Sequence, residues 1–123
     1  MTAAALPWLL GLASFGVAER EPVPDARPRL VAALRAPDGR ASGILGGELA
    51  EGIGRRFQAS GAIFIDVTTV HRYVQPGCAR LNVTFRQDDV LIPGAATPER
   101  QTIEFGINYC LDGSPPASLE IQR

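Results

Sequence analysis

Two segments that alternate strictly between apolar and polar side chains constrain this chain most, and each adjoins one of its two cysteines. In "ARLNVTFRQ" the odd-numbered positions from Ala79 to Phe85 are apolar, and in "QTIEFGINYC" the odd-numbered positions from Ile103 to Tyr109 are apolar. Such alternation is typical of antiparallel strands with one buried face and one face in water. The sequence therefore predicts two half-buried strands.

The cysteines fit a cross-strand disulfide between these segments. An antiparallel register that opposes Cys78 and Cys110 also opposes every apolar residue of one strand to an apolar residue of the other. Directly opposed Cβ atoms lie about 4.5–5.5 Å apart, which is near disulfide reach. No C-x-x-C is present, and two Cys with the single His make an incomplete zinc site. We expect a Cys78–Cys110 disulfide. The strand register has one alternative: a tight turn at Asp88-Asp89 would pair residues 79–86 with 90–93 first, and this pairing is compatible with the same disulfide.

Composition narrows the function classes. At 123 residues the chain is one domain at most, and its net charge of −1 disfavours nucleic-acid binding. All twelve basic residues are Arg, so Schiff-base chemistry and a P-loop lysine are excluded. With one His, a metal site built on several imidazoles is excluded as well. We expect no cofactor and no metal.

The N-terminus suggests export. Residues 1–18 carry no charge and end in Gly16 and Ala18, which suit the −3 and −1 positions of a cleavage site before Glu19. A basic n-region is absent. The segment is predicted to be a signal peptide, which places the protein in the periplasm or outside the cell with no stable membrane span after cleavage. An uncleaved N-terminal membrane anchor and a buried helix are the alternatives.

The rest of the chain divides into three parts. The stretch "EREPVPDARP", residues 19–28, is predicted to be an extended linker because it combines three prolines with five charges. Residues 29–112 are the predicted domain, and residues 113–123 are predicted to be a flexible tail. Within the domain, "RLVAALRAPDGRASGIL" predicts a hairpin that turns at Pro37-Asp38-Gly39. A helix capped by Ser42 is the competing interpretation.

A helix and a third strand complete the prediction. In "GGELAEGIGRRFQASG", the residues Leu49, Ile53 and Phe57 form one apolar stripe at helical spacing, and the interior glycines suggest close packing against a sheet. The segment "AIFIDVTTVHRYV", residues 62–74, is β-branched and aromatic, as strands are. The fold class is therefore α+β: a mostly antiparallel sheet with one packed helix, forming a single disulfide-stapled domain.

Candidate functional residues lie in two places. The wet face of residues 79–87 carries a possible interaction face. A weaker candidate is a ligand site at the end of residues 62–74, centred on His71. As a general base, His71 would need a carboxylate to orient it. Asp66 does not meet this need on a straight strand, because it is five positions away and points to the opposite face. The residues concerned are Arg80, Asn82, Thr84 and Arg86 for the interaction face, and His71, Arg72 and Tyr73 for the ligand site.

One resemblance can be stated on the cysteine-bearing segments. "QPGCARLNVTFRQDDVLIPGA" followed by "IEFGINYCLDGSPP" resembles small exported proteins encoded with integrating conjugative elements and related plasmid transfer systems. The resemblance covers roughly residues 62–116. It implies an accessory role in the cell envelope, in conjugation or secretion, and it carries no catalytic motif.

These observations predict a non-enzymatic exported interaction module with a protein partner in the cell envelope. The alternative is a small ligand-binding protein or enzyme centred on His71. The sequence leaves the identity of the partner and the oligomeric state open.

Overall fold

The register predicted between the two cysteine-bearing strands is confirmed in the computed structural model, which describes residues 20–123. From Cys78↔Cys110 to Gln87↔Gln101 the strands pair without a break, and the disulfide is formed. The chain does not turn at Asp88-Asp89. Instead the ladder is interrupted there by a bulge, with Asp89 at φ 57°, and pairing resumes at Val90.

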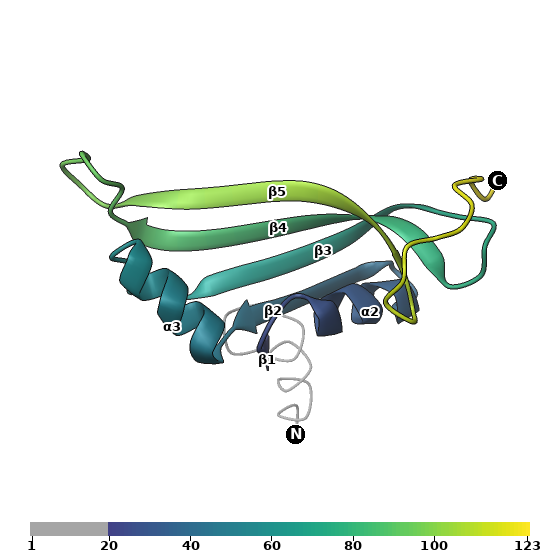
Figure 1. Cartoon of the computed structure of the whole chain (residues 1–123), viewed down its shortest axis with the longest axis horizontal. Coiled ribbons are helices and arrows are strands. Elements are labelled where there is room, and N and C mark those ends of the chain that lie inside the picture. The colour runs from purple at the N-terminus through teal and green to yellow at the C-terminus, as the bar shows by residue number, and fades with distance from the viewer. Residues whose placement is uncertain (1–19) are drawn as a thin grey trace, which may run out of the picture.

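The five strands form one sheet in the order β1-β2-β3-β4-β5, and both helices lie on the same side of it (Figure 1). Only β1 and β2 are parallel; all other neighbours are antiparallel. The fold is thus α+β with a mostly antiparallel sheet. The elements are β1 (Glu21–Val23), α2 (Arg27–Arg35), β2 (Arg40–Leu45), α3 (Gly47–Arg56), β3 (Ile63–Arg72), β4 (Cys78–Val90) and β5 (Glu99–Cys110).

The hairpin predicted for residues 29–45 is wrong in its first half. Residues 27–35 form the helix α2, and the helix that would have been capped by Ser42 is absent because Ser42 lies within β2. Leu30, Ala33 and Leu34 are buried, at the spacing of one helix face. The turn before β2 does occur where it was predicted, with Gly39 at φ 69°, a conformation that glycine adopts without strain.

The predicted linker, residues 19–28, also contains regular structure from residue 21 onward. Strand β1 lies at one edge of the sheet and pairs in parallel with β2, and α2 begins at Arg27. The prolines are compatible with both elements. Pro22 lies in an edge strand, and Pro28 occupies the first turn of the helix, where a missing N–H is harmless. The predicted signal peptide, residues 1–18, lies outside the described residues.

The core forms where α2 crosses the sheet. Leu30, Ala33 and Leu34 of the helix pack on apolar side chains of the three central strands. The fully covered floor consists of Ile65, Val67, Ala79, Leu81 and Val83, each at most 1% exposed. Ala79, Leu81 and Val83 belong to the odd-numbered row that the alternation predicted, and Ile65 and Val67 are on β3, where they pair with Phe85 and Val83 of that row. The helix that packs on the sheet is therefore α2, which the sequence interpretation had assigned to a strand.

Helix α3 forms where it was predicted, but none of its residues is buried. The close packing suggested by its glycines is not found. A Cβ atom at Gly52 would meet nothing within 4 Å, and one at Gly54 would meet the carbonyl oxygen of Ala59 in the following loop rather than the sheet. Only Ala50 and Ile53 of this helix contact the core. Within the apolar stripe of α3, Ile53 therefore reaches the core, whereas Leu49 and Phe57 are 49% and 44% exposed.

The predicted flexible tail is held by hydrogen bonds to the end of β3 and the loop after it. The backbone N–H of Val74 donates to the carbonyl of Glu120, and that of Gln122 donates to the carbonyl of Arg72. The Gln75 side-chain oxygen accepts hydrogen bonds from the backbone N–H groups of Ala117 and Ser118, 2.7 and 3.2 Å away. The tail therefore belongs to the folded unit. Neither described helix has the length and apolar content that crossing a membrane requires.

Candidate functional site

The two cysteines act as a staple on the polar face of the sheet. Cys78 and Cys110 are 3% and 4% exposed and pack with the buried Tyr73. The Tyr73 hydroxyl donates to Asn108 Oδ1 at 2.7 Å, which satisfies the one polar atom of this cluster. Because both sulfurs are bonded to each other, neither serves as a nucleophile or a metal ligand in this state.

The predicted interaction face, Arg80, Asn82, Thr84 and Arg86, does lie on one face of β4, but both of its arginines are engaged within the sheet. Arg80 lies against Gly106, at a position where a Cβ would collide with its guanidinium, and donates to Asn108 at 3.2 Å. The Arg86 guanidinium lies 4.6 Å from the ring centre of Phe64. Of the two arginines, only Arg80 uses an N–H donor within the sheet, whereas the buried Nε of Arg86 has no hydrogen-bond partner. A role in partner binding stays a prediction.

The predicted ligand site at the end of β3 is divided by a bulge. Pairing with β4 shifts between Thr69 and His71, so the residues after Val70 change faces relative to a straight strand. His71 therefore shares a face with Asp66, contrary to the expectation. Its ring contacts that of Tyr73 edge-on, at 5.1 Å between centres.

The partners expected for His71 are committed elsewhere. Arg72 lies on the opposite face and donates to the carbonyl oxygens of Leu34 and Ala36, at the C-terminus of α2. Asp66 accepts a hydrogen bond from the Ser42 hydroxyl at 2.8 Å and forms an ion pair with Arg20. The trio His71, Arg72 and Tyr73 is thus not brought together around one space.

A hollow at the α3 end of the sheet is the site that the sequence interpretation missed. It encloses about 420 Å³ between α3, the odd-numbered face of β4 and β5, and the start of the β4–β5 loop. Its walls are almost wholly apolar. The lining residues are Leu45, Leu49, Ile53, Phe57, Ile63, Phe85, Arg86, Gln87, Val90, Ile92, Pro93, Gln101 and Ile103.

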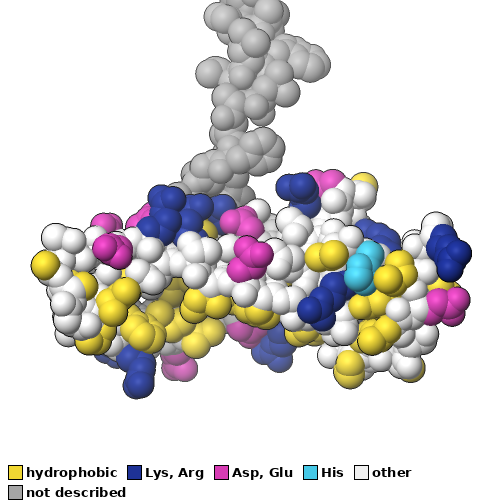
Figure 2. All heavy atoms as spheres, turned by 90° about the horizontal axis from the view of Figure 1, so that it is seen from above, with side chains coloured by type: hydrophobic (Ala, Val, Ile, Leu, Met, Phe, Trp, Pro, Cys, Tyr) yellow, Lys and Arg dark blue, Asp and Glu magenta, His cyan; other side chains and the backbone are white. Residues whose placement is uncertain are grey.

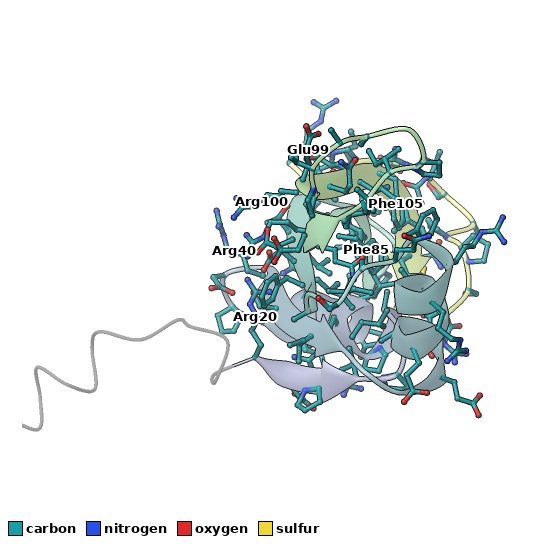
Figure 3. The ribbon with its side chains drawn as sticks, turned by 90° about the vertical axis from the view of Figure 1, so that its left-hand side faces the viewer. Arg20, Arg40, Phe85, Glu99, Arg100 and Phe105 are labelled. Atoms are coloured by element: carbon teal, nitrogen blue, oxygen red, sulfur yellow. A yellow bond between two sulfur atoms is a disulfide. The ribbon has the colours of Figure 1, made fainter. Side chains whose placement is uncertain are left out.

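Large apolar side chains around this hollow are in contact with water. The exposed fractions are 49% for Leu49, 44% for Phe57, 65% for Ile103 and 42% for Phe105. The rings of Phe85 and Phe105 stack 6.0 Å apart and form an aromatic floor. Figure 3 shows Phe85 and Phe105 on the side of the sheet where α3 lies, whereas Arg20 lies on the other side. In Figure 2 hydrophobic side chains gather along one flank of the molecule, which is hollowed there.

Two signals in the sequence point to parts of this hollow. The stripe Leu49, Ile53 and Phe57 and the odd row of the strands were both recognised, but each was assigned to the core. A second, shallower depression of about 480 Å³ lies on the other side of α3, with Glu51, Arg55 and Gln87 in its lining. His71 lines neither of these two hollows. In residues 20–123 no three His, Cys, Asp or Glu side chains are grouped so that they could hold a metal ion.

Comparison with known proteins adds no assignment. No family model matches the chain, and no curated protein and no solved structure is significantly similar to it.

Proposed function

We propose that this protein is a non-enzymatic, exported interaction module that binds a protein partner in the cell envelope and serves a conjugative transfer or secretion apparatus. The binding site in this proposal is the apolar hollow beside α3. The occupant is an apolar segment of the partner, which places its hydrophobic side chains against the aromatic floor and leaves its polar groups toward solvent.

The exposure of the hollow's apolar side chains is the observation that carries the proposal. Soluble proteins rarely leave a contiguous group of large apolar side chains in water, and larger patches of this kind mark binding surfaces. Here Leu49, Phe57 and Ile103 line one depression and are each at least 44% exposed, and Phe105, which is 42% exposed, stacks on the lining residue Phe85. Covering them would contribute about 25 cal/mol for every Å² of apolar surface removed from water.

Export is supported by the disulfide. Structural disulfides persist in oxidising compartments such as the periplasm and are rare in the reducing cytosol. The Cys78–Cys110 bond closes a loop of 32 residues and is buried, which is the pattern of a structural rather than a catalytic bond.

Site-specific photo-crosslinking tests the proposed hollow. A photoreactive phenylalanine analogue at position 57 should crosslink one defined envelope protein in living cells. The same analogue at position 70 is the matched control, because Val70 is 59% exposed and lies outside the hollow. Adding Leu49→Asp should abolish the crosslink from position 57. Equal crosslinking from both positions, or crosslinking that survives Leu49→Asp, would contradict the proposal.

The biological role is tested separately. Deleting the gene from a strain that carries the transfer system should reduce DNA transfer at least tenfold, and the wild-type gene should restore it. A Leu49→Asp allele should fail to restore transfer, although its product accumulates and forms the disulfide. Unchanged transfer in the deletion strain would remove the conjugative part of the proposal.

The volume of the hollow favours one second candidate, a protein that binds a small apolar ligand. Small-molecule sites are mostly apolar and of about 300–1,000 Å³, a range that includes the 420 Å³ found here. This candidate replaces the alternative centred on His71, which lines neither hollow. Native mass spectrometry of protein purified from its own cells would reveal a retained ligand as a mass increment that Phe57→Asp removes.

A further inference from the structure

The open edge of β5 is the second unusual surface of this molecule. The order β1-β2-β3-β4-β5 leaves one side of β5 without a neighbouring strand in the described part of the chain, as Figure 1 shows. The strand has twelve residues and contains no proline. Natural proteins protect such edges with prolines, lysines, bulges or short strands, because a long free edge pairs readily with another strand.

Hydrogen bonds at the end of β5 identify which backbone groups face outward. The N–H of Leu111 donates to Gly77, on the β4 side, whereas the N–H of Cys110 points the other way and donates to Ser114. Backbone groups alternate in direction along a strand, so the even-numbered residues of β5 direct their N–H and C=O groups toward the open edge. The turn after β5 covers this row at Cys110, and the row continues uncovered through Glu104 and Thr102.

We propose that this edge pairs with the same edge of a second copy of the chain, in antiparallel orientation about a two-fold axis at Thr102. This inference goes beyond the proposed function, because it concerns the strand edge rather than the hollow and needs no other protein. It joins two five-stranded sheets into one ten-stranded sheet with both α3 helices on the same side.

Charge complementarity selects this register. With Thr102 opposite its own copy, Arg100 of each chain lies opposite Glu104 of the other, on the polar face, which gives two opposite-charge pairs per dimer. A shift of two residues, with Glu104 on the axis, would oppose two like charges. The Arg100 side chain is 61% exposed and bonds Asp88 through Nε, which leaves its terminal nitrogens free for a carboxylate.

The apolar face is compatible with the same register. Ile103, the most exposed large apolar side chain near the hollow, lies opposite Gln101 of the other chain and diagonally across the axis from its own copy, within reach of a contact. Pairing therefore removes part of its exposed surface from water. The stretch "RQTIEFGIN" can pair with the same stretch of a second copy, because it alternates between apolar and polar residues and carries an Arg and a Glu four positions apart.

Cysteine substitution on the axis tests the register in the purified, oxidised protein. Opposed residues in a hydrogen-bonded pair have Cα atoms about 5.5 Å apart, which suits a disulfide. Thr102→Cys should give a covalent dimer, because its new thiol lies beside its own copy. Glu104→Cys and Ile103→Cys report the neighbouring registers and should crosslink at least tenfold more slowly. Faster crosslinking at either of those positions, or none at any of the three, would overturn the proposal.

Charge reversal tests the same pairing without a covalent bond. Glu104→Arg should raise the dimer dissociation constant, measured by sedimentation equilibrium, about tenfold or more, and added salt should weaken the wild-type dimer because the ion pairs are exposed. Combining it with Arg100→Glu should restore dimerisation. Glu120→Arg makes the same charge change in the tail and should leave the dissociation constant unchanged. A wild-type protein that is monomeric at millimolar concentration would overturn the proposal, whereas the photo-crosslink from position 57 would be unaffected.

Discussion

The two ends of the sheet's apolar face share one sequence pattern and differ in what covers them. On β5, Ile107 and Tyr109 at the α2 end pack against the core, whereas Ile103 and Phe105 at the α3 end are 65% and 42% exposed. All four belong to the same alternating row and point to the same side of the sheet. Alternation therefore specifies which face is apolar, and the helix above that face decides whether it becomes core.

The helices explain the difference. Helix α2 has three buried side chains against the sheet, and Arg72 of β3 donates hydrogen bonds to carbonyls at its C-terminus. Helix α3 has the better-defined apolar stripe but no buried side chain. An amphipathic helix is stabilised mainly by the surface on which it packs. The exposed stripe of α3 therefore points to a surface that is completed by another molecule.

Truncating a side chain at the α2 end of the sheet, the closed end, should have the largest effect on stability. Leu81→Ala removes a side chain that is fully buried beneath α2 and should lower the free energy of unfolding by about 4 kcal/mol, from lost burial and the cavity left behind. Urea denaturation followed by circular dichroism measures the change. A loss below about 1 kcal/mol would mean that the α2 end is no better packed than the α3 end.

Removal of the disulfide should have the next largest effect. The bond joins β4 and β5 at the closed end, next to Ala79 and Tyr109, which contact the core. Replacing both Cys78 and Cys110 by Ser should lower the free energy of unfolding by about 3 kcal/mol, because the 32-residue loop is no longer closed in the unfolded chain. Reductant should shift the urea midpoint of the wild-type protein to that of the variant and leave the variant unchanged.

Truncating a side chain at the α3 end of the sheet, the open end, should have a small effect on stability. Phe57→Ala and Ile103→Ala each remove a side chain that is at least 44% exposed, so we expect each to change the free energy of unfolding by at most about 1 kcal/mol. The same urea titration serves as the measurement. A loss as large as that of Leu81→Ala would show that the hollow closes in solution and would contradict its description as open.

The smallest effect should come from pH at the entry to α2. The side chain and backbone N–H of Arg27 donate to Asp25 and lower the pKa of its carboxyl from 3.8 to about 2. The carboxylate therefore favours folding above pH 3.8, and this contribution is lost as the pH falls toward 2. An NMR titration of the Asp25 carboxyl carbon should give a midpoint near 2. Arg27→Ala should return that midpoint to the ordinary range, and an unchanged midpoint would contradict the assigned cause.

The sequence predicts best what depends on local pattern. The register of β4 and β5, the disulfide, the turn at Gly39 and the extent of α3 all follow from alternation, turn residues and helical spacing. The segment of α2 was misassigned because the turn at Pro37-Asp38-Gly39 suggested a hairpin, although Ala and Leu residues favour a helix and Pro28 suits its first turn. Burial of Leu30, Ala33 and Leu34 against the sheet decides for the helix, and burial is a tertiary property.

The candidate site was harder to predict for the same reason. Each wall of the hollow is visible in the sequence as an amphipathic element, yet the hollow between Phe57 and Phe85 depends on how α3 is placed over the sheet. No local pattern encodes that placement. The register shift near Val70, which turned His71 toward the face of Asp66, likewise leaves no trace in composition or alternation.

Because of that register shift, we expect the strand to tolerate deletion of Val70. Thr69 pairs with Leu81 and His71 with Arg80, so Val70 is an insertion of one residue into an otherwise continuous ladder. A chain lacking Val70 would keep His71, Arg72 and Tyr73 on their present faces and would retain the contacts of Arg72 with α2 and of Tyr73 with Asn108. Inserting one more residue into β3 at this point would move His71, Arg72 and Tyr73 to the opposite faces of the sheet. The strand should thus accept a deletion here far more readily than an insertion.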